Sequence, residues 1–162
     1  MTKTSNSELL SLIQVLSSED DLGVVVRVHL HIEQQLNLII EGLVPHPKSL
    51  PRLRFEQKIK LAIALGLNQD FFEPLKKIGD IRNSFSHDIK AKLTRDLVIE
   101  FLAALTQAQL DKLNKAYEKT LAQLCDGRPF WENHHRQIFT LLSVFLYVEM
   151  ENPIKHLKRV RK

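Results

Sequence analysis

The chain has 162 residues, a net charge of +4 and one cysteine. This length predicts one domain with a substantial core. No apolar run approaches the roughly 18 residues of a membrane span, and the first residues do not resemble a signal peptide. We therefore expect no contact with a membrane. Cys125 has no partner for an internal disulfide, which favours the reducing cytoplasm. The mildly basic charge permits a nucleic-acid partner without requiring one.

Apolar residues recur at helical spacing almost throughout, and five glycines with few alternating β-branched runs leave little room for strands. We therefore predict an all-α, single-domain bundle of about six or seven helices built round a long second helix. The expected domain covers residues 1–151, and residues 152–162 form a basic tail. With their caps, the expected helices run from about Ser7 to Ser17, Asp20 or Asp21 to Val44, Arg54 to Leu65, Asn68 to His87, Thr94 to Ala104, Gln109 to Leu124 and Asn133 to Glu149.

Prolines, glycines and short polar side chains set these boundaries. The proline-rich segment 45–51 must end the second helix, because proline lacks a backbone donor and restrains its neighbour. Gly66 is placed to form a left-handed C-cap, and Asn68 and Thr94 are suited to N-cap positions. A clear turn is expected at 126–129, and Pro153 follows the last helix.

The second helix carries a polar pair beside its apolar stripe. At 100° per residue, one face collects six apolar side chains: Val25, Val28, Ile32, Leu36, Ile39 and Leu43. His29 and Glu33 fall next to this stripe rather than on the polar side. A carboxylate there is costly unless it is paired, so Glu33 needs a partner. His29 alone is more often a satisfied core residue than a ligand.

The helix ending at His87 offers that partner. Its apolar face consists of Leu75, Ile78, Ile81 and Phe85. Arg82 lies within the same arc, and Gly79 at its border permits close packing. We therefore expect a buried bidentate pair between Arg82 and Glu33. Asn83 and His87 are four residues apart and share a neighbouring side with Lys76.

The segment 81–88, Ile-Arg-Asn-Ser-Phe-Ser-His-Asp, follows an Ala-Leu-Gly-Leu sequence at 64–67. This combination resembles HEPN-type domains and the related mannitol operon repressor family over about residues 20–104. The resemblance implies that Arg82 and His87 form a ribonuclease active site, assisted by Asn83. It also implies a homodimer that brings two such motifs together. Glu33 matches the acidic residue that faces the arginine in many HEPN domains, and His29 beside it is a second supporting candidate.

The implied reaction is RNA cleavage by attack of the ribose 2′-hydroxyl on the adjacent phosphate, without a metal or cofactor. His87 would transfer a proton, and Arg82 would stabilise the phosphate charge. Residues five apart on a regular helix diverge by about 140°, so the helix must loosen or a second chain must complete the site.

Two functional classes remain open. One is a toxin-type or defence-type endoribonuclease, and the other is a non-catalytic regulator that binds a protein or nucleic acid, as the mannitol-repressor resemblance implies. A protein partner would then be an antitoxin or another regulator. Weaker candidates for nucleic-acid contact are Lys76 and three residues of the tail: Lys158, Arg159 and Arg161. No metal site is expected, because His29 and His31 cannot share a helix face. The wide apolar arcs of the second and last helices favour a homodimer.

Overall fold

Seven α-helices and two short 3-10 helices form the described part of the computed structural model, which comprises residues 6–88, 90–118 and 133–160. The described residues contain no strand, and the all-α expectation is confirmed. The elements are α1 (Asn6–Ser18), α2 (Asp21–Leu43), η1 (Pro47–Ser49), α3 (Phe55–Ala64), η2 (Gln69–Phe71), α4 (Phe72–His87), α5 (Arg95–Ala103), α6 (Gln107–Ala116) and α7 (His135–Val160). Within the described ranges, no helix is long and apolar enough to cross a bilayer.

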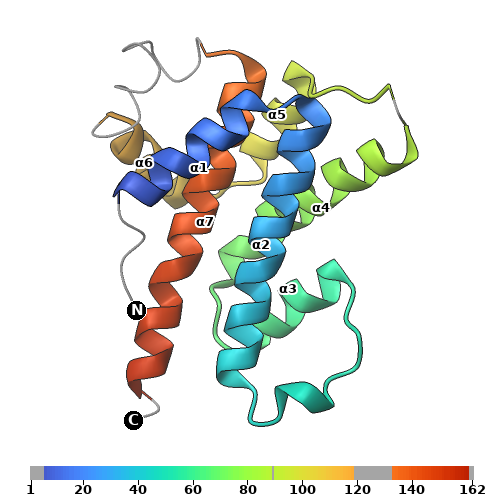
Figure 1. Ribbon diagram of the computed structural model, residues 1–162. Helices are drawn as coiled ribbons and strands as arrows, with labels where there is room; N and C mark the ends of the chain where they lie inside the picture. The colour runs from blue at the N-terminus through green and yellow to red at the C-terminus, as the bar shows by residue number, and fades with distance from the viewer. Residues whose placement is uncertain (1–5, 89, 119–132, 161–162) are drawn as a thin grey trace.

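Two long helices, α2 and α7, lie side by side at the centre of the bundle (Figure 1). The helices α1, α3 and α4 pack against α2, and α5 packs against α7. All six residues of the expected α2 stripe are buried, as are the four of α4. Every residue of α7 from Ile138 to Leu146 is buried too. Over this span the wide apolar arc of α7 therefore belongs to the core of the bundle rather than to an exposed dimer surface.

The last helix is longer than expected. It continues past Glu149, through Asn152 and Pro153, to Val160. Proline has a helical φ, so the helix can continue at the loss of one backbone hydrogen bond. Lys158 and Arg159 thus belong to α7 rather than to an irregular tail, although their side chains are not among those described. Arg161, Cys125 and the turn expected at 126–129 lie outside the described residues.

The capping residues mostly act as the sequence predicts. The Asp20 carboxylate accepts a hydrogen bond from Gly23 N at 2.7 Å, and the Thr94 hydroxyl accepts one from Leu97 N at 3.3 Å. Gly66 has a φ of 113°, which only glycine adopts without strain. Asn68 instead caps η2, through Asp70 N at 3.0 Å, and α4 begins after that short helix.

A polar clamp joins three distant segments at one end of the bundle. The Asp21 carboxylate accepts a hydrogen bond from Leu93 N at 3.0 Å. The Arg136 guanidinium donates to the Glu19 carbonyl at 2.8 Å and lies 3.7 Å from the Asp21 carboxylate. The start of α2, the segment before α5 and the first turn of α7 are thereby held together.

Candidate functional site: a charged groove between α2, α3 and α4

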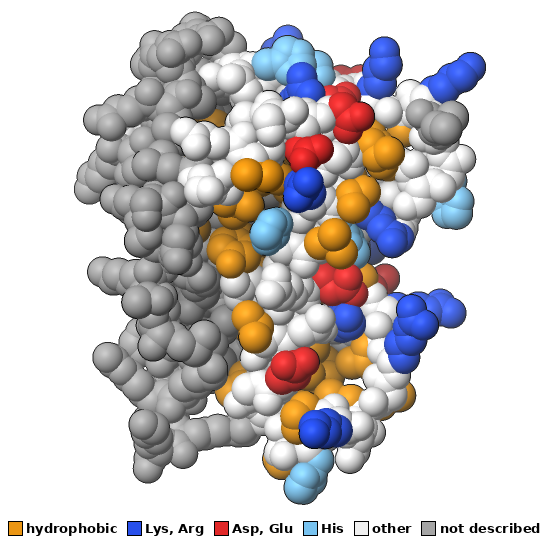
Figure 2. Space-filling model, in the orientation of Figure 1, with side chains coloured by type: hydrophobic (Ala, Val, Ile, Leu, Met, Phe, Trp, Pro, Cys, Tyr) orange, Lys and Arg blue, Asp and Glu red, His pale blue; other side chains and the backbone are white. Residues whose placement is uncertain are grey.

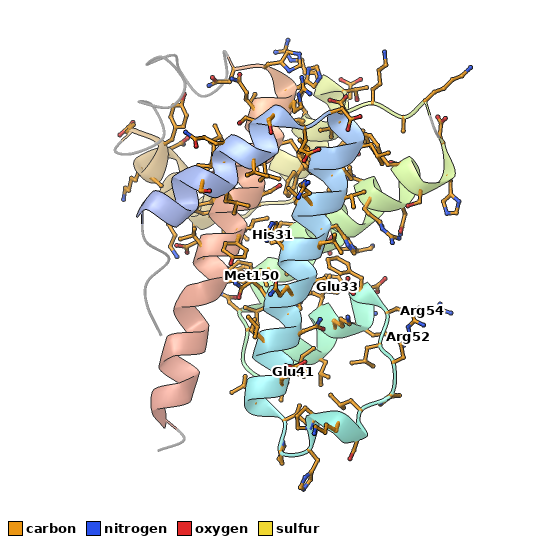
Figure 3. All side chains as sticks on the ribbon, in the orientation of Figure 1. His31, Glu33, Glu41, Arg52, Arg54 and Met150 are labelled. Carbon is orange, nitrogen blue, oxygen red and sulfur yellow. The ribbon has the colours of Figure 1, made fainter. Side chains whose placement is uncertain are left out.

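A groove of about 980 Å³ opens between α2, the segment leading into α3, and α4. Glu33 and Glu41 belong to the α2 wall, and Arg52 and Arg54 to the segment before α3 (Figure 3). The third wall is the α4 face that carries Lys76, Gly79, Asp80, Arg82 and Asn83. Five of the residues singled out from the sequence line this groove: Arg82, Asn83, Lys76, Glu33 and His29.

The partner of Glu33 is Lys58, from α3. The Lys58 Nζ and Glu33 Oε1 atoms are 2.7 Å apart, and the two side chains are 17% and 27% exposed. Burial alone would raise the pKa of Glu33, but the hydrogen bond and charge of Lys58, with the charges of His29 and Arg82, bring the pKa below its usual value. The expected Glu33–Arg82 pair is therefore wrong, because α3 places a lysine at the carboxylate.

Arg82 is exposed at the border of the buried α4 face, rather than lying within it. Its Nη1 donates to the Asn83 side-chain oxygen at 3.1 Å. Its positive charge still acts on the groove, since it lowers the pKa of both Glu33 and His29. Arg82 and Asn83 together offer an accessible guanidinium held by a neighbouring amide, which is suited to an anionic ligand.

Three further cations of the groove form no ion pair with a carboxylate of the described residues, although the charge of Lys76 acts on Glu56: Arg52, Arg54 and Lys76. The acidic lining residues are Glu33, bound to Lys58; Glu56, bound to Lys60; and Glu41 and Asp80. Figure 2 shows Lys and Arg side chains along the side of the molecule formed by α4 and the segment before α3. The groove thus has a surplus of cations that no internal ion pair occupies.

His29 lies in the floor of the groove and is 7% exposed. Its ring packs on that of Phe55, with 4.3 Å between centroids and 38° between the ring planes, and its Nδ1 lies 4.0 Å from Glu33 Oε2. Burial lowers the pKa of His29, and the charges of Arg82 and Lys58 lower it further, against the opposing effect of Glu33. His29 is therefore neutral near pH 7.

Gly79 makes the close contact that the sequence predicts, and its neighbour is Phe55. A Cβ atom at Gly79 would lie 2.9 Å from Phe55 Cδ1, closer than carbon atoms pack. The absence of a side chain at Gly79 lets the Phe55 ring reach between α2 and α4, where it supports His29. The groove floor is therefore built from all three helices.

His87 stands apart from the other motif residues. It is the last residue of α4, it is exposed, and it does not line the groove. One chain consequently brings Arg82, Asn83, Lys76, Glu33 and His29 to one groove and leaves His87 outside it. Among the described residues there is also no cluster of histidine, cysteine and carboxylate groups that could hold a metal ion.

The lining residues that the sequence analysis did not single out include Lys58, Phe55, Arg52 and Arg54. For the first two a signal existed. Phe55 and Lys58 are three residues apart, and Ile59 and Ala62 of the same helix are buried, so all four share one side of α3. The two arginines lie outside regular structure and carry no periodic signal.

A second surface feature is an apolar stripe on α2, formed by Leu22, Val26 and Leu30. These side chains are 48%, 38% and 56% exposed and follow one another at successive turns. Hydrophobic side chains are visible along the course of α2 in Figure 2. The expected apolar surface of the second helix is thus partly open to solvent.

Comparison of the chain with protein-family models, with curated protein sequences and with solved structures finds no significant match.

Proposed function

We propose that the protein is a HEPN-like, homodimeric RNA-binding protein whose groove between α2, α3 and α4 receives the phosphate backbone. The observation that carries this proposal is the gathering of Arg52, Arg54, Lys76 and Arg82 round one groove, where none of the four forms an ion pair with a carboxylate of the described residues. Guanidinium groups bind two phosphate oxygens in one plane, so such a set suits a chain of phosphates.

The arrangement favours a single strand over a duplex. A groove of about 980 Å³ has room for a few nucleotides of one strand, and sequence-specific RNA recognition mostly targets single strands whose bases are unstacked. Polar groups on the α2 and α4 walls, such as Asn37 and Asn83, can meet base edges that a single strand leaves free.

The second part of this proposal is that the protein also cleaves the RNA that it binds. Arg82 lines the groove, whereas His87 lies beyond it, so a His87 near a bound phosphate would have to come from a second copy of the chain. The α2 apolar stripe is the surface on which we propose that the two copies meet, because its three hydrophobic side chains are exposed.

Fluorescence anisotropy with a labelled 12-nucleotide single-stranded RNA tests the binding proposal. We expect Arg82→Gln to weaken binding at least threefold. The slope of log K against log salt concentration should become shallower by about 0.7, because one phosphate contact of a single strand is lost. Lys112→Gln is the matched control, since Lys112 is an exposed cation bound to Glu149 on another side of the bundle. Equal affinities for both variants and the unmodified protein would refute the proposal.

Arg82→Gln should also fold normally. Arg82 is exposed and Glu33 keeps its bond to Lys58, so no buried charge loses its partner. A loss of RNA affinity in this variant would therefore report on the groove itself.

A non-catalytic regulator is the second candidate function, and the α2 apolar stripe favours it. Leu22, Val26 and Leu30 form a surface of the kind that binds another protein. A monomer in light scattering with no RNA affinity at 50 mM salt would support this alternative. It would gain further support from a defined heteromeric complex that Leu30→Glu disrupts.

A further inference from the structure

We propose that His29 is a ligand-binding residue of the groove floor: a phosphate held by Arg82 also contacts the His29 imidazolium, so that binding takes up one proton. This inference rests on the proposed function, because it assigns a residue to the same groove. His29 is not part of the proposed catalytic set of Arg82, Asn83 and His87.

The geometry of the ring is the first support. The His29 side chain lines the groove, and one side of its imidazole packs against the Phe55 ring. Neither ring nitrogen has a hydrogen-bond partner among the described residues; the nearest carboxylate oxygen is that of Glu33, 4.0 Å from Nδ1. Although His29 is only 7% exposed, its ring nitrogens are not among the buried side-chain atoms that lack a partner, so they keep access to the groove, where a ligand can take the place of solvent.

The charges around His29 provide the second support. Glu33 on α2 favours the imidazolium, while Lys58 on α3 and Arg82 on α4 oppose it, and burial opposes it most. In the free protein this balance leaves the ring neutral at pH 7. A phosphate beside Arg82 adds negative charge next to the imidazole and offsets the positive charge of Arg82, so both effects favour protonation of His29.

Phosphate binding and protonation of His29 are thermodynamically linked. If binding raises the pKa of His29, the ligand binds more tightly to the protonated protein, and affinity increases as pH falls from neutral toward the pKa of the free state. The phosphodiesters of RNA do not titrate in this range, so a pH-dependent affinity reports on the protein. The dependence is limited to about tenfold per pH unit, because one group is involved.

The experiment has two arms, both with the full-length protein. In the first, anisotropy measures the affinity for the 12-nucleotide RNA between pH 5.5 and 8.5 at constant ionic strength. We expect several-fold tighter binding at pH 6 than at pH 8, and a loss of most of this difference in His29→Gln. His31→Gln is the matched control: His31 also lies on α2, and burial likewise lowers its pKa, but its ring packs on Tyr147. Its pH dependence should equal that of the unmodified protein.

In the second arm, histidine ring signals of ¹³C-labelled protein are titrated by NMR with and without 50 mM sulfate, replacing chloride at equal ionic strength. Sulfate keeps a constant charge over this range and stands in for the phosphodiester. We expect the anion to raise the pKa of His29 and to leave that of His31 unchanged. This arm needs no folded variant, so a His29→Gln protein that fails to fold does not affect it.

The outcomes separate the two proposals. Absence of RNA binding, with a sulfate-dependent increase in the pKa of His29, would overturn the proposed RNA function and support this inference. RNA binding that is equally pH-dependent in His29→Gln, or a His29 signal that sulfate leaves unchanged, would overturn this inference and leave the RNA function intact. If RNA does not bind and sulfate does not shift His29, both are wrong.

Discussion

Replacing Lys58 by methionine gives a direct test of how the groove is held together. Methionine keeps an unbranched side chain of similar length, so the alkyl packing changes little, while the partner of Glu33 is lost. The two charged atoms are 2.7 Å apart, and the side chains are 17% and 27% exposed. Because the pair is only partly buried, we expect a cost of about 2 kcal/mol, below that of breaking a fully buried pair. For a domain of this size, this lowers Tm by about 4 to 8 °C.

The pH dependence provides the sharper part of the test. In the unmodified protein the pKa of Glu33 is lowered, so its contribution to stability is present above its ordinary pKa of 4.5 and is lost as pH falls through the lower value of the folded state. Loss of Lys58 removes the main effects that offset burial, so the pKa of Glu33 should be higher in the variant than in the unmodified protein. Protonation of Glu33 as pH falls then removes the charge that has lost its partner, so the stability difference between the two proteins should shrink from pH 7 to pH 4.

Chemical denaturation followed by circular dichroism at pH 7 and pH 4 measures both effects. Lys60→Met is the control, since Lys60 lies on the same helix but its pair with Glu56 is exposed, and no measurable change is expected. The double variant Lys58→Met with Glu33→Gln should recover much of the loss, because no charge then remains without a partner. A Lys58→Met cost that is the same at pH 7 and pH 4, or that the second substitution does not reduce, would refute this account of the groove.

Three other variants test separate parts of the structure. In Gly79→Ala, the new Cβ meets Phe55 at 2.9 Å, so denaturation should show a loss of about 1–3 kcal/mol; an unchanged midpoint would mean that Phe55 moves freely. Leu30→Glu should convert the proposed dimer to a monomer in light scattering, whereas an unchanged mass would place any interface elsewhere. Incubation with RNA in EDTA should yield 2′,3′-cyclic phosphate ends, and His87→Ala, at an exposed helix end, should lose this activity without losing stability; equal cleavage by His87→Ala would exclude His87 from catalysis.

Local signals in the sequence predicted the helices well. Asp20, Thr94 and Gly66 act within a few residues of themselves, through caps and a left-handed turn, so their effect can be read without knowing the fold. The buried faces of α2 and α4 follow from periodicity alone. The end of α7 was predicted less well, because Pro153 has a helical φ and does not by itself fix where a helix stops.

The candidate site could be predicted only in part, for a geometric reason. Periodicity indicated that Glu33 needs a partner, but the choice between Arg82 and Lys58 depends on how α3 and α4 are placed round α2. That placement in turn rests on Gly79 and Phe55, which let the helices approach. The sequence therefore indicated the need for an ion pair, and tertiary packing decided its second member.

The clamp at Asp21 bears on the order in which the protein folds. Its bonds join residues separated by 72 and by 117 positions in the chain, so each requires the closure of a long loop. Contacts of such high sequence separation form after the local helices and are mostly absent from an early transition state. Substitution of Asp21 by alanine should therefore act mainly on the unfolding rate and leave the refolding rate nearly unchanged. This end of the bundle would then determine how long the native state lasts, but it would have little effect on how fast the protein folds.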